Sequence, residues 1–191
     1  MSFVEIFIVV VIVAVLCWYI HSFVNSEMEY VKSRVDGRSY LVLSLPDKQQ
    51  AADYLAEING DVVALIKHLK AKYPGNAEYD ALYQHYDPDK ISEGSPDSNY
   101  TSYTINKSAM VICIRQNDEH KTFVDKNVLM YVIIHELVHM KNRTDIGHTP
   151  KFWTDFKDML NDAIEMGAYR KVDYKTNPAP YCGITLSSSV V

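Results

Sequence analysis

Two histidines and a glutamate in one short apolar stretch are the residues of this sequence best suited to chemistry. His135, Glu136 and His139 form the pattern H-E-x-x-H, directly after an apolar run. On a helix the two histidines lie four residues apart, so both imidazoles project from one face and can hold a zinc ion. Glu136 is displaced around the helix, where it can take a proton from a water molecule that zinc activates. The pattern predicts a zinc centre with Glu136 as general base. The alternative is a surface helix that merely carries these residues.

A third zinc ligand is expected just after this helix, at His148. Thr149 and Pro150 are typical of the N-cap and the first residue of a helix, so His148 stands immediately before a second helix. Gly147 allows the backbone to turn sharply in front of it. Three histidines with an open fourth position are typical of a catalytic zinc site, whereas a structural site is closed by a fourth ligand. The alternative for His148 is a solvated loop histidine.

This arrangement resembles the SprT-like and WLM-type minimal zinc metallopeptidases. They share H-E-L-x-H, a variable loop, and a third histidine followed by an aromatic pair, here at residues 152–153. Similar membrane-anchored chains are encoded by large DNA viruses, so the resemblance implies a viral origin. It also implies an α+β zincin-like fold, in which a small sheet accompanies the active-site helix. Zinc would be held by His135, His139 and His148, with Glu136 as general base.

The resemblance further implies a peptide or protein substrate, paired with an edge strand that precedes the metal helix. Residues 109–115 are the candidate for that strand, and a plain buried strand is the alternative. Two features depart from known groups. The eight residues between His139 and His148 differ from the five-residue spacer of metzincins. SprT relatives act on DNA-bound proteins, but the net charge of −5 does not favour nucleic acid as a partner.

An apolar segment near the N-terminus, residues 6–24, is long enough to cross a membrane. As a helix it spans about 28 Å, close to the thickness of the hydrocarbon layer. Trp18 and Tyr19 suit the membrane interface. A cleaved signal peptide is one alternative, although no Lys or Arg precedes the segment. A buried core helix is another. The sequence thus predicts a single-pass membrane protein with an N-terminal transmembrane anchor.

The domain after this segment is expected to face the cytosol, in a cellular or virion membrane. Basic residues between positions 32 and 38 favour the cytosolic side by their charge. A glycan on the sequon at Asn142 would crowd the metal site, so the sequons are expected to be incidental. Cys113 and Cys182 form no dense disulfide framework, which agrees with a reducing compartment.

Hydrophobic periodicity predicts both strands and helices in the body. Strands are expected at 39–45, 101–106 and 109–115, and helices at 49–73, 77–86, around the H-E-x-x-H stretch and from Pro150 to Gly167. The expected division is an anchor at 1–25, a juxtamembrane segment at 26–38, a zincin-like domain at 39–175 and a C-terminal tail at 176–191, of which only the Ser-rich end is expected to be loose.

These observations predict a membrane-anchored zinc metallopeptidase that hydrolyses peptide bonds with Glu136 as general base. The alternative is a non-enzymatic, membrane-anchored structural or assembly protein of a virus particle, in which the metal acts as a staple. Both hypotheses retain the three histidine ligands. The spacing does not choose an oxyanion donor between Tyr174 and Tyr181, and it does not indicate an oligomeric state.

Overall fold

The computed structural model describes residues 7–16, 27–94, 101–106, 108–142 and 147–191 of the chain. Residues 7–16 form a helix whose side chains are exposed. Among the described residues, no helix combines the length and the apolar character that crossing a bilayer requires. This finding corrects the transmembrane anchor expected over residues 6–24, of which residues 6 and 17–24 lie outside the described part.

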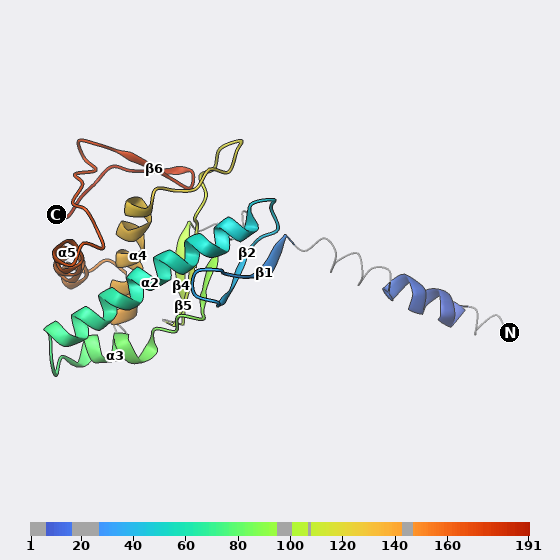
Figure 1. The fold of residues 1–191 in the computed structure, drawn as a ribbon, viewed down its shortest axis with the longest axis horizontal. Helices are drawn as coiled ribbons and strands as arrows, with labels where there is room; N and C mark the ends of the chain where they lie inside the picture. The colour runs from blue at the N-terminus through green and yellow to red at the C-terminus, as the bar shows by residue number, and fades with distance from the viewer. Residues whose placement is uncertain (1–6, 17–26, 95–100, 107, 143–146) are drawn as a thin grey trace.

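The body that follows is α+β, as the sequence predicts. Its elements, in chain order, are β1 (Met28–Lys32), β2 (Ser39–Leu43), α2 (Lys48–Lys72), α3 (Ala77–His85), β3 (Ile91–Glu93), β4 (Ser102–Ile105), β5 (Ala109–Ile112), α4 (Lys126–Lys141), α5 (Pro150–Glu165), β6 (Ala179–Tyr181) and β7 (Ile184–Leu186) (Figure 1). Strand β1 forms inside the expected juxtamembrane segment at 26–38, and β3 forms between the helix expected at 77–86 and the strand expected at 101–106, where neither a helix nor a strand is expected.

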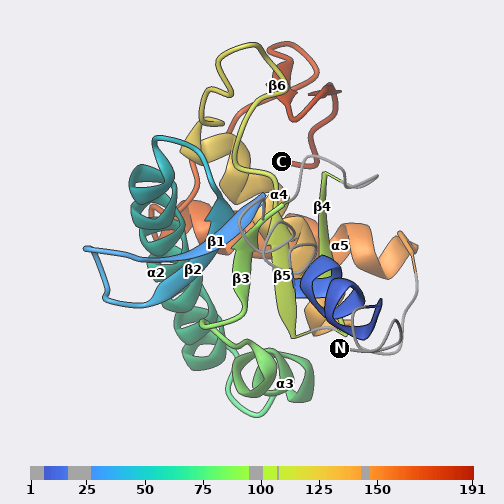
Figure 2. The ribbon, with the colours of Figure 1, turned by 90° about the vertical axis from the view of Figure 1, so that its right-hand side faces the viewer.

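The first five strands lie side by side in the order β1, β2, β3, β5, β4, with α4 and α5 behind them (Figure 2). β1 and β2 form an antiparallel hairpin, and the amide of Leu43 at its end donates to Oε2 of Glu93 in β3 at 2.8 Å. β5 runs parallel to β3 and antiparallel to β4, so it is the central strand of its sheet. Residues 109–115 are therefore not an edge strand, and β4 takes the edge position instead.

Helix α4, which carries the H-E-x-x-H pattern, is the central helix of the body. The Asp125 side chain caps it by accepting hydrogen bonds from the amides of Asn127 and Val128. Its buried side chains are distributed all around the helix axis, which explains why the sequence is apolar both before and after His135. Helix α5 begins where expected, with Thr149 as its N-cap and Pro150 as its first residue. Its buried side chains are Phe152, Phe156, Met159, Leu160, Asp162 and Ala163.

The C-terminal segment, expected as a separate tail at 176–191, is tied to the body. β6 and β7 form a hairpin, and Tyr181 of β6 is buried. A disulfide joins Cys113 to Cys182 across 69 residues of sequence. The Gln116 side chain donates to the carbonyl of Pro180 at 2.9 Å. Cys113 and Cys182, for which the sequence indicates no dense disulfide framework, thus cross-link the β6–β7 hairpin to the residue that follows β5.

Candidate metal centre

The structure brings the three predicted histidines together. His135 and His139 come from successive turns of α4, and His148 comes from the segment just before α5. Nε2 of His148 lies 3.0 Å from Nε2 of His135 and 3.2 Å from Nε2 of His139. The three side chains offer ligand atoms within 4.8 Å of one another. His148 is exposed, while the other two are half-buried, so the cluster opens to solvent on the His148 side.

The spacing of these nitrogens fits a single metal ion. With Zn–N distances of about 2.0–2.1 Å, two ligands of a tetrahedral site lie about 3.3 Å apart. The two distances from Nε2 of His148, 3.0 and 3.2 Å, are close to that value. A shared proton can produce such a distance for one pair of rings, but it cannot serve three nitrogens that converge. The three histidines therefore form a donor set that could hold zinc or a similar divalent metal.

Burial keeps the first histidine in the form that binds metals. Burial and the neighbouring rings of His139 and His148 lower the pKa of His135 to about 3. A neutral imidazole has a free nitrogen lone pair, and metal ligation needs that lone pair. His135 is thus neutral across the physiological pH range.

Glu136 follows His135 on α4 and is buried in an apolar setting. Its side chain is only 8% exposed. Burial raises the pKa of its carboxyl to about 7 from the ordinary 4.5. A carboxyl with such a pKa exchanges a proton readily near neutral pH, which suits a general base.

One aromatic ring packs against all three histidines. The Phe152 ring centroid lies 4.8 Å from that of His135, 4.5 Å from that of His139 and 4.7 Å from that of His148. Phe152 is 1% exposed, whereas the neighbouring Trp153 is 43% exposed and lies 5.4 Å from the His148 ring. From the sequence, Phe152 is expected as half of the aromatic pair at 152–153, and not as a ring that packs against the three ligands.

The two tyrosines considered as oxyanion donors are buried. Tyr174 and Tyr181 are each 1% exposed, so neither lies in the exposed, irregular segment that the sequence suggests. The Tyr181 hydroxyl is within hydrogen-bond distance of the Ser102 hydroxyl. Burial raises the pKa of Tyr181 above its ordinary value, and the nearby Glu136 carboxylate adds to that effect. Neither tyrosine is assigned to the centre.

Charged side chains at the end of α4 are the group that sequence reasoning missed. Lys141 and Asn142 interact there with Lys151 and Asp155 of α5. The four-residue spacing of Lys151 and Asp155 is typical of a helical ion pair, and it is the only local signal of this arrangement.

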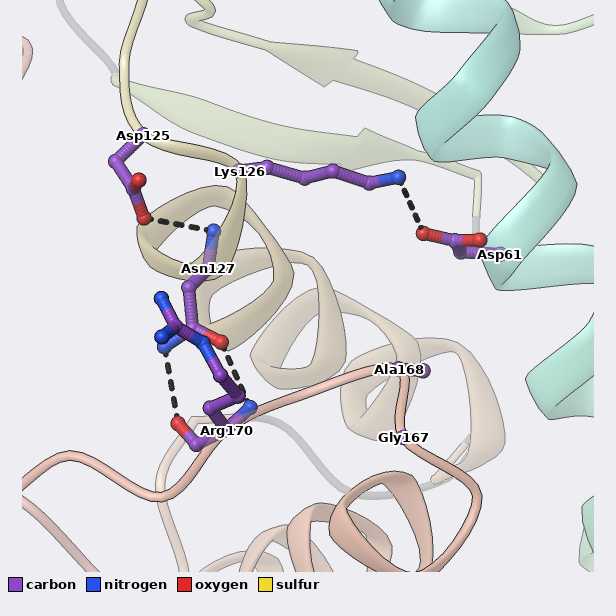
Figure 3. A pocket seen from close by; sticks show the side chains of 7 residues that line it. All are labelled: Asp61, Asp125, Lys126, Asn127, Gly167, Ala168 and Arg170. Atoms are coloured by element: carbon purple, nitrogen blue, oxygen red, sulfur yellow. Dashed lines mark hydrogen bonds and ion pairs between the residues drawn. The ribbon is translucent and has the colours of Figure 1, made fainter.

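A cavity at the opposite end of α4 does not belong to the metal centre (Figure 3). His135 lies about 13 Å further along the helix axis than Lys126, at 1.5 Å per residue. Several polar groups of the cavity pair with one another: Lys126 pairs with Asp61 at 2.8 Å, and the Asn127 side chain binds the backbone of Arg170. The cavity is lined by Asp61, Asp125, Lys126, Asn127, Gly167, Ala168 and Arg170.

The chain is similar to a family of viral capsid proteins and to uncharacterized proteins of large DNA viruses. Residues 35–185 match the family model described as Phycodnaviridae minor capsid protein P4. Uncharacterized protein R325 of Acanthamoeba polyphaga mimivirus is 30% identical over 193 aligned residues, covering 98% of this chain and 96% of the relative. Uncharacterized protein 042R of Invertebrate iridescent virus 3 is 46% identical over 68 residues, 36% of this chain and 42% of the relative. No solved structure matches the chain.

These matches correct three predictions. The assignment to the SprT-like and WLM-type metallopeptidases is wrong, because the family model that covers most of the body is a capsid protein model. The classification as a transmembrane metalloprotease is replaced by that of a capsid-related viral protein. The localisation as a single-pass membrane protein facing the cytosol is likewise not supported, because no helix among the described residues could cross a bilayer and the matching family model is that of a capsid protein. The expectation of a viral protein is confirmed.

Proposed function

This chain belongs to the family of the Phycodnaviridae minor capsid protein P4, and from that premise we propose that it is a structural component of a virus particle whose histidine centre holds a metal ion. The observation that carries the metal-binding part is the convergence of the three Nε2 atoms, with spacings of 3.0 and 3.2 Å. All three histidines lie inside the segment that matches the family model. The structural role thus follows from the family, and the metal binding from the three histidines of this chain.

The metal would connect two helices. His135 and His139 would hold it from α4, and His148 would hold it from the start of α5. A bound metal stabilises the folded state because the unfolded chain does not present a preformed site. The disulfide between Cys113 and Cys182 supports the same role, since disulfides are typical of virion surfaces and other oxidising locations. The bound metal and the disulfide would both stabilise the folded domain in a particle outside the cell.

Particle composition tests the structural part of this proposal. Particles of the encoding virus would be purified and their proteins quantified against the infected-cell lysate. We expect the chain to co-purify with particles at a constant copy number. A virus carrying His148→Ala is expected to yield fewer stable particles, whereas His85→Ala, an exposed histidine outside the centre, serves as the matched control. Absence of the wild-type chain from purified particles would contradict the structural role.

Hydrolysis of an amide bond at the same centre is a second candidate function. Fold and family do not decide chemistry, which resides in sites. The observation that favours it is the buried Glu136 carboxyl beside three histidines that leave a metal position open. A bound metal would supply Lewis acidity and a more acidic water. Glu136 would accept the proton at its carboxylate and deliver it to the leaving amine.

The variant Glu136→Gln tests this second candidate. It removes the proton acceptor but none of the three histidines. We expect the variant to bind zinc as the wild type does and to lose cleavage of an unfolded protein such as casein. Cleavage by the wild type that persists in Glu136→Gln would contradict the assigned role of Glu136.

A further inference from the structure

Five polar side chains gather where α4 ends, next to the segment that carries His148. They come from α3, from the last residues of α4 and from the first turns of α5. Despite its charge, Lys141 is 4% exposed, and Asn142 is equally buried. We refer to the group as the charge cluster, and its members are Glu78, Lys141, Asn142, Lys151 and Asp155.

Asp155 is the residue that the other helix contacts most. One of its oxygens, Oδ1, lies 2.8 Å from Nζ of Lys141. The other, Oδ2, accepts from Nζ of Lys151 at 2.6 Å and from Nδ2 of Asn142 at 2.9 Å. Burial alone would raise the pKa of Asp155, but these three hydrogen bonds outweigh it and lower the pKa. Asp155 is therefore ionised at neutral pH and bonded to the end of α4 by both oxygens.

The two lysines complete a closed set of contacts. Lys141 also pairs with Oε2 of Glu78 in α3 at 2.8 Å. Lys151 pairs with the same oxygen at 3.0 Å and donates to Oδ1 of Asn142 at 2.9 Å. Each lysine thus contacts both carboxylates. The cluster therefore joins the end of α4, the start of α5 and the first turn of α3 at one place.

The position of the cluster relates it to His148. The α4 backbone sets the relative position of His135 and His139, but His148 belongs to no helix and precedes α5. Asn142 stands before the segment that contains His148, and Lys151 stands after it. On α5, Lys151 and Asp155 face the cluster, while Phe152 packs against the histidine rings. The place of His148 therefore depends on how α5 is joined to α4.

We propose that Asp155 is a positioning residue for the metal centre, which, together with Lys141 and Lys151, holds His148 within reach of His135 and His139. This inference rests on the proposed metal binding. Buried ion pairs often contribute little net stability compared with apolar residues of similar size, but they can select one arrangement of packed elements. The charge cluster accordingly acts on metal affinity more than on the stability of the metal-free fold.

Zinc affinity of the full chain tests the inference, measured by competition with a chromophoric chelator. Asp155→Asn keeps the shape of the side chain but loses its charge, and we expect zinc affinity to fall by about 10- to 100-fold, as for other outer partners of metal ligands. Asp162→Asn is the matched control. Asp162 also lies on α5, is 3% exposed and binds Lys72 at 2.7 Å, away from the histidines. Its variant is expected to keep zinc affinity within about threefold of wild type, since it removes no contact of the cluster.

A second pair of variants covers the case in which Asp155→Asn fails to fold. Lys151 is more exposed, so Lys151→Gln removes its ion pairs with little risk to the fold. We expect Lys151→Gln to weaken zinc binding and to alter the visible spectrum of the cobalt(II) form. Lys151→Arg, which retains the charge, is expected to restore both toward wild type.

The outcomes separate the two proposals. Wild-type zinc affinity in Asp155→Asn, or in Lys151→Gln where the former does not fold, would overturn the positioning role and leave the metal centre intact. An equal loss of affinity in Asp162→Asn would also overturn it, because the effect would then be one of general stability. A wild-type chain that binds no zinc would overturn the proposed metal binding, and the positioning role with it.

Discussion

The ring of Phe152 lies 4.5 Å from the ring of His139, at an interplanar angle of 34°. The same ring contacts the other two histidines, so one buried side chain supports the complete donor set. The ligands are therefore packed in place by an apolar contact as well as by the backbone that carries them.

Phe152→Ala is expected to lower both stability and zinc affinity. Removing a buried phenylalanine costs about 3–5 kcal/mol of unfolding free energy and leaves a cavity beneath the imidazoles. Leu160→Ala, also on α5 and fully buried, is the control for a core defect of about 2–5 kcal/mol. Urea unfolding and zinc competition would be measured for both. Equal zinc affinities in the two variants would show that Phe152 acts only as a core residue.

His148→Ala is expected to remove zinc binding. The full chain should purify with about one zinc per chain after metal-replete expression, and the variant with far less, because two histidines alone hold zinc weakly. Zinc at 100 times its dissociation constant should stabilise the wild type by about 2.7 kcal/mol, a shift that the variant should lack. Zinc content by atomic absorption and thermal midpoints with and without EDTA would be compared, with His85→Ala as control. Unchanged zinc content in His148→Ala would mean that another residue completes the site.

Cys182→Ser is expected to destabilise the body and to free the β6–β7 hairpin. The disulfide closes a loop of about 70 residues, for which the chain-entropy model gives about 4 kcal/mol. Reduction by dithiothreitol should lower the thermal midpoint of the wild type to that of the variant. Cys17→Ser, at a position outside the described residues, controls for the loss of a thiol. A wild-type midpoint that does not respond to dithiothreitol would argue against the cross-link.

Asp53 is expected to make stability depend on acid pH. It accepts from the backbone amide of Arg34 at 2.7 Å and from its Nε at 2.8 Å, which joins the β1–β2 hairpin to α2. Burial opposes ionisation, but these bonds outweigh it and lower the pKa of Asp53 to about 2 from 3.8. Since the unfolded chain keeps the higher pKa, this stabilisation is complete above about pH 4 and is lost as the pH falls toward 2.

The variant Asp53→Asn isolates that contribution. Its deficit in unfolding free energy relative to wild type should be largest at pH 7 and should shrink between about pH 4 and pH 2. Urea titrations at pH 7, 4 and 2.5 would measure it. A deficit that stays constant over this range would contradict the assigned pKa shift.

The features that were predictable from the sequence are those with local signals. His135 and His139 share a helix, and their four-residue spacing alone predicts that they lie on one face. Thr149 and Pro150 mark the start of α5, which places His148 just before it. The apolar repeat of α2 is equally local, and the helix forms close to the expected 49–73.

The features that could not be predicted depend on partners distant in the sequence. The disulfide joins residues 69 positions apart, and Glu78 meets Lys141 only because α3 packs against the end of α4. β5 is a central strand because the three-residue β3, within a loop-like stretch, pairs with it. Periodicity does not encode such pairings.

The family could not be identified from the H-E-x-x-H motif alone, because the motif is short. H-E-x-x-H reports which chemistry the residues can support, and the same pattern can arise in unrelated families. The match to a capsid protein model extends over residues 35–185, far beyond the motif. The short motif therefore predicts candidate metal ligands, whereas the family follows from the match over the much longer segment.

The pairing of Asn127 with Arg170 has a consequence for how the protein opens. The Asn127 amide donates to the carbonyl of Arg170 at 2.9 Å and accepts from its backbone amide at 2.7 Å, as a neighbouring peptide strand would (Figure 3). The two residues close a loop of chain that contains all three histidines. Local opening in small proteins tends to follow such contiguous units. In hydrogen exchange, the amides of α4 and α5 should then exchange as one group, and the metal ligands should separate only when that whole group unfolds.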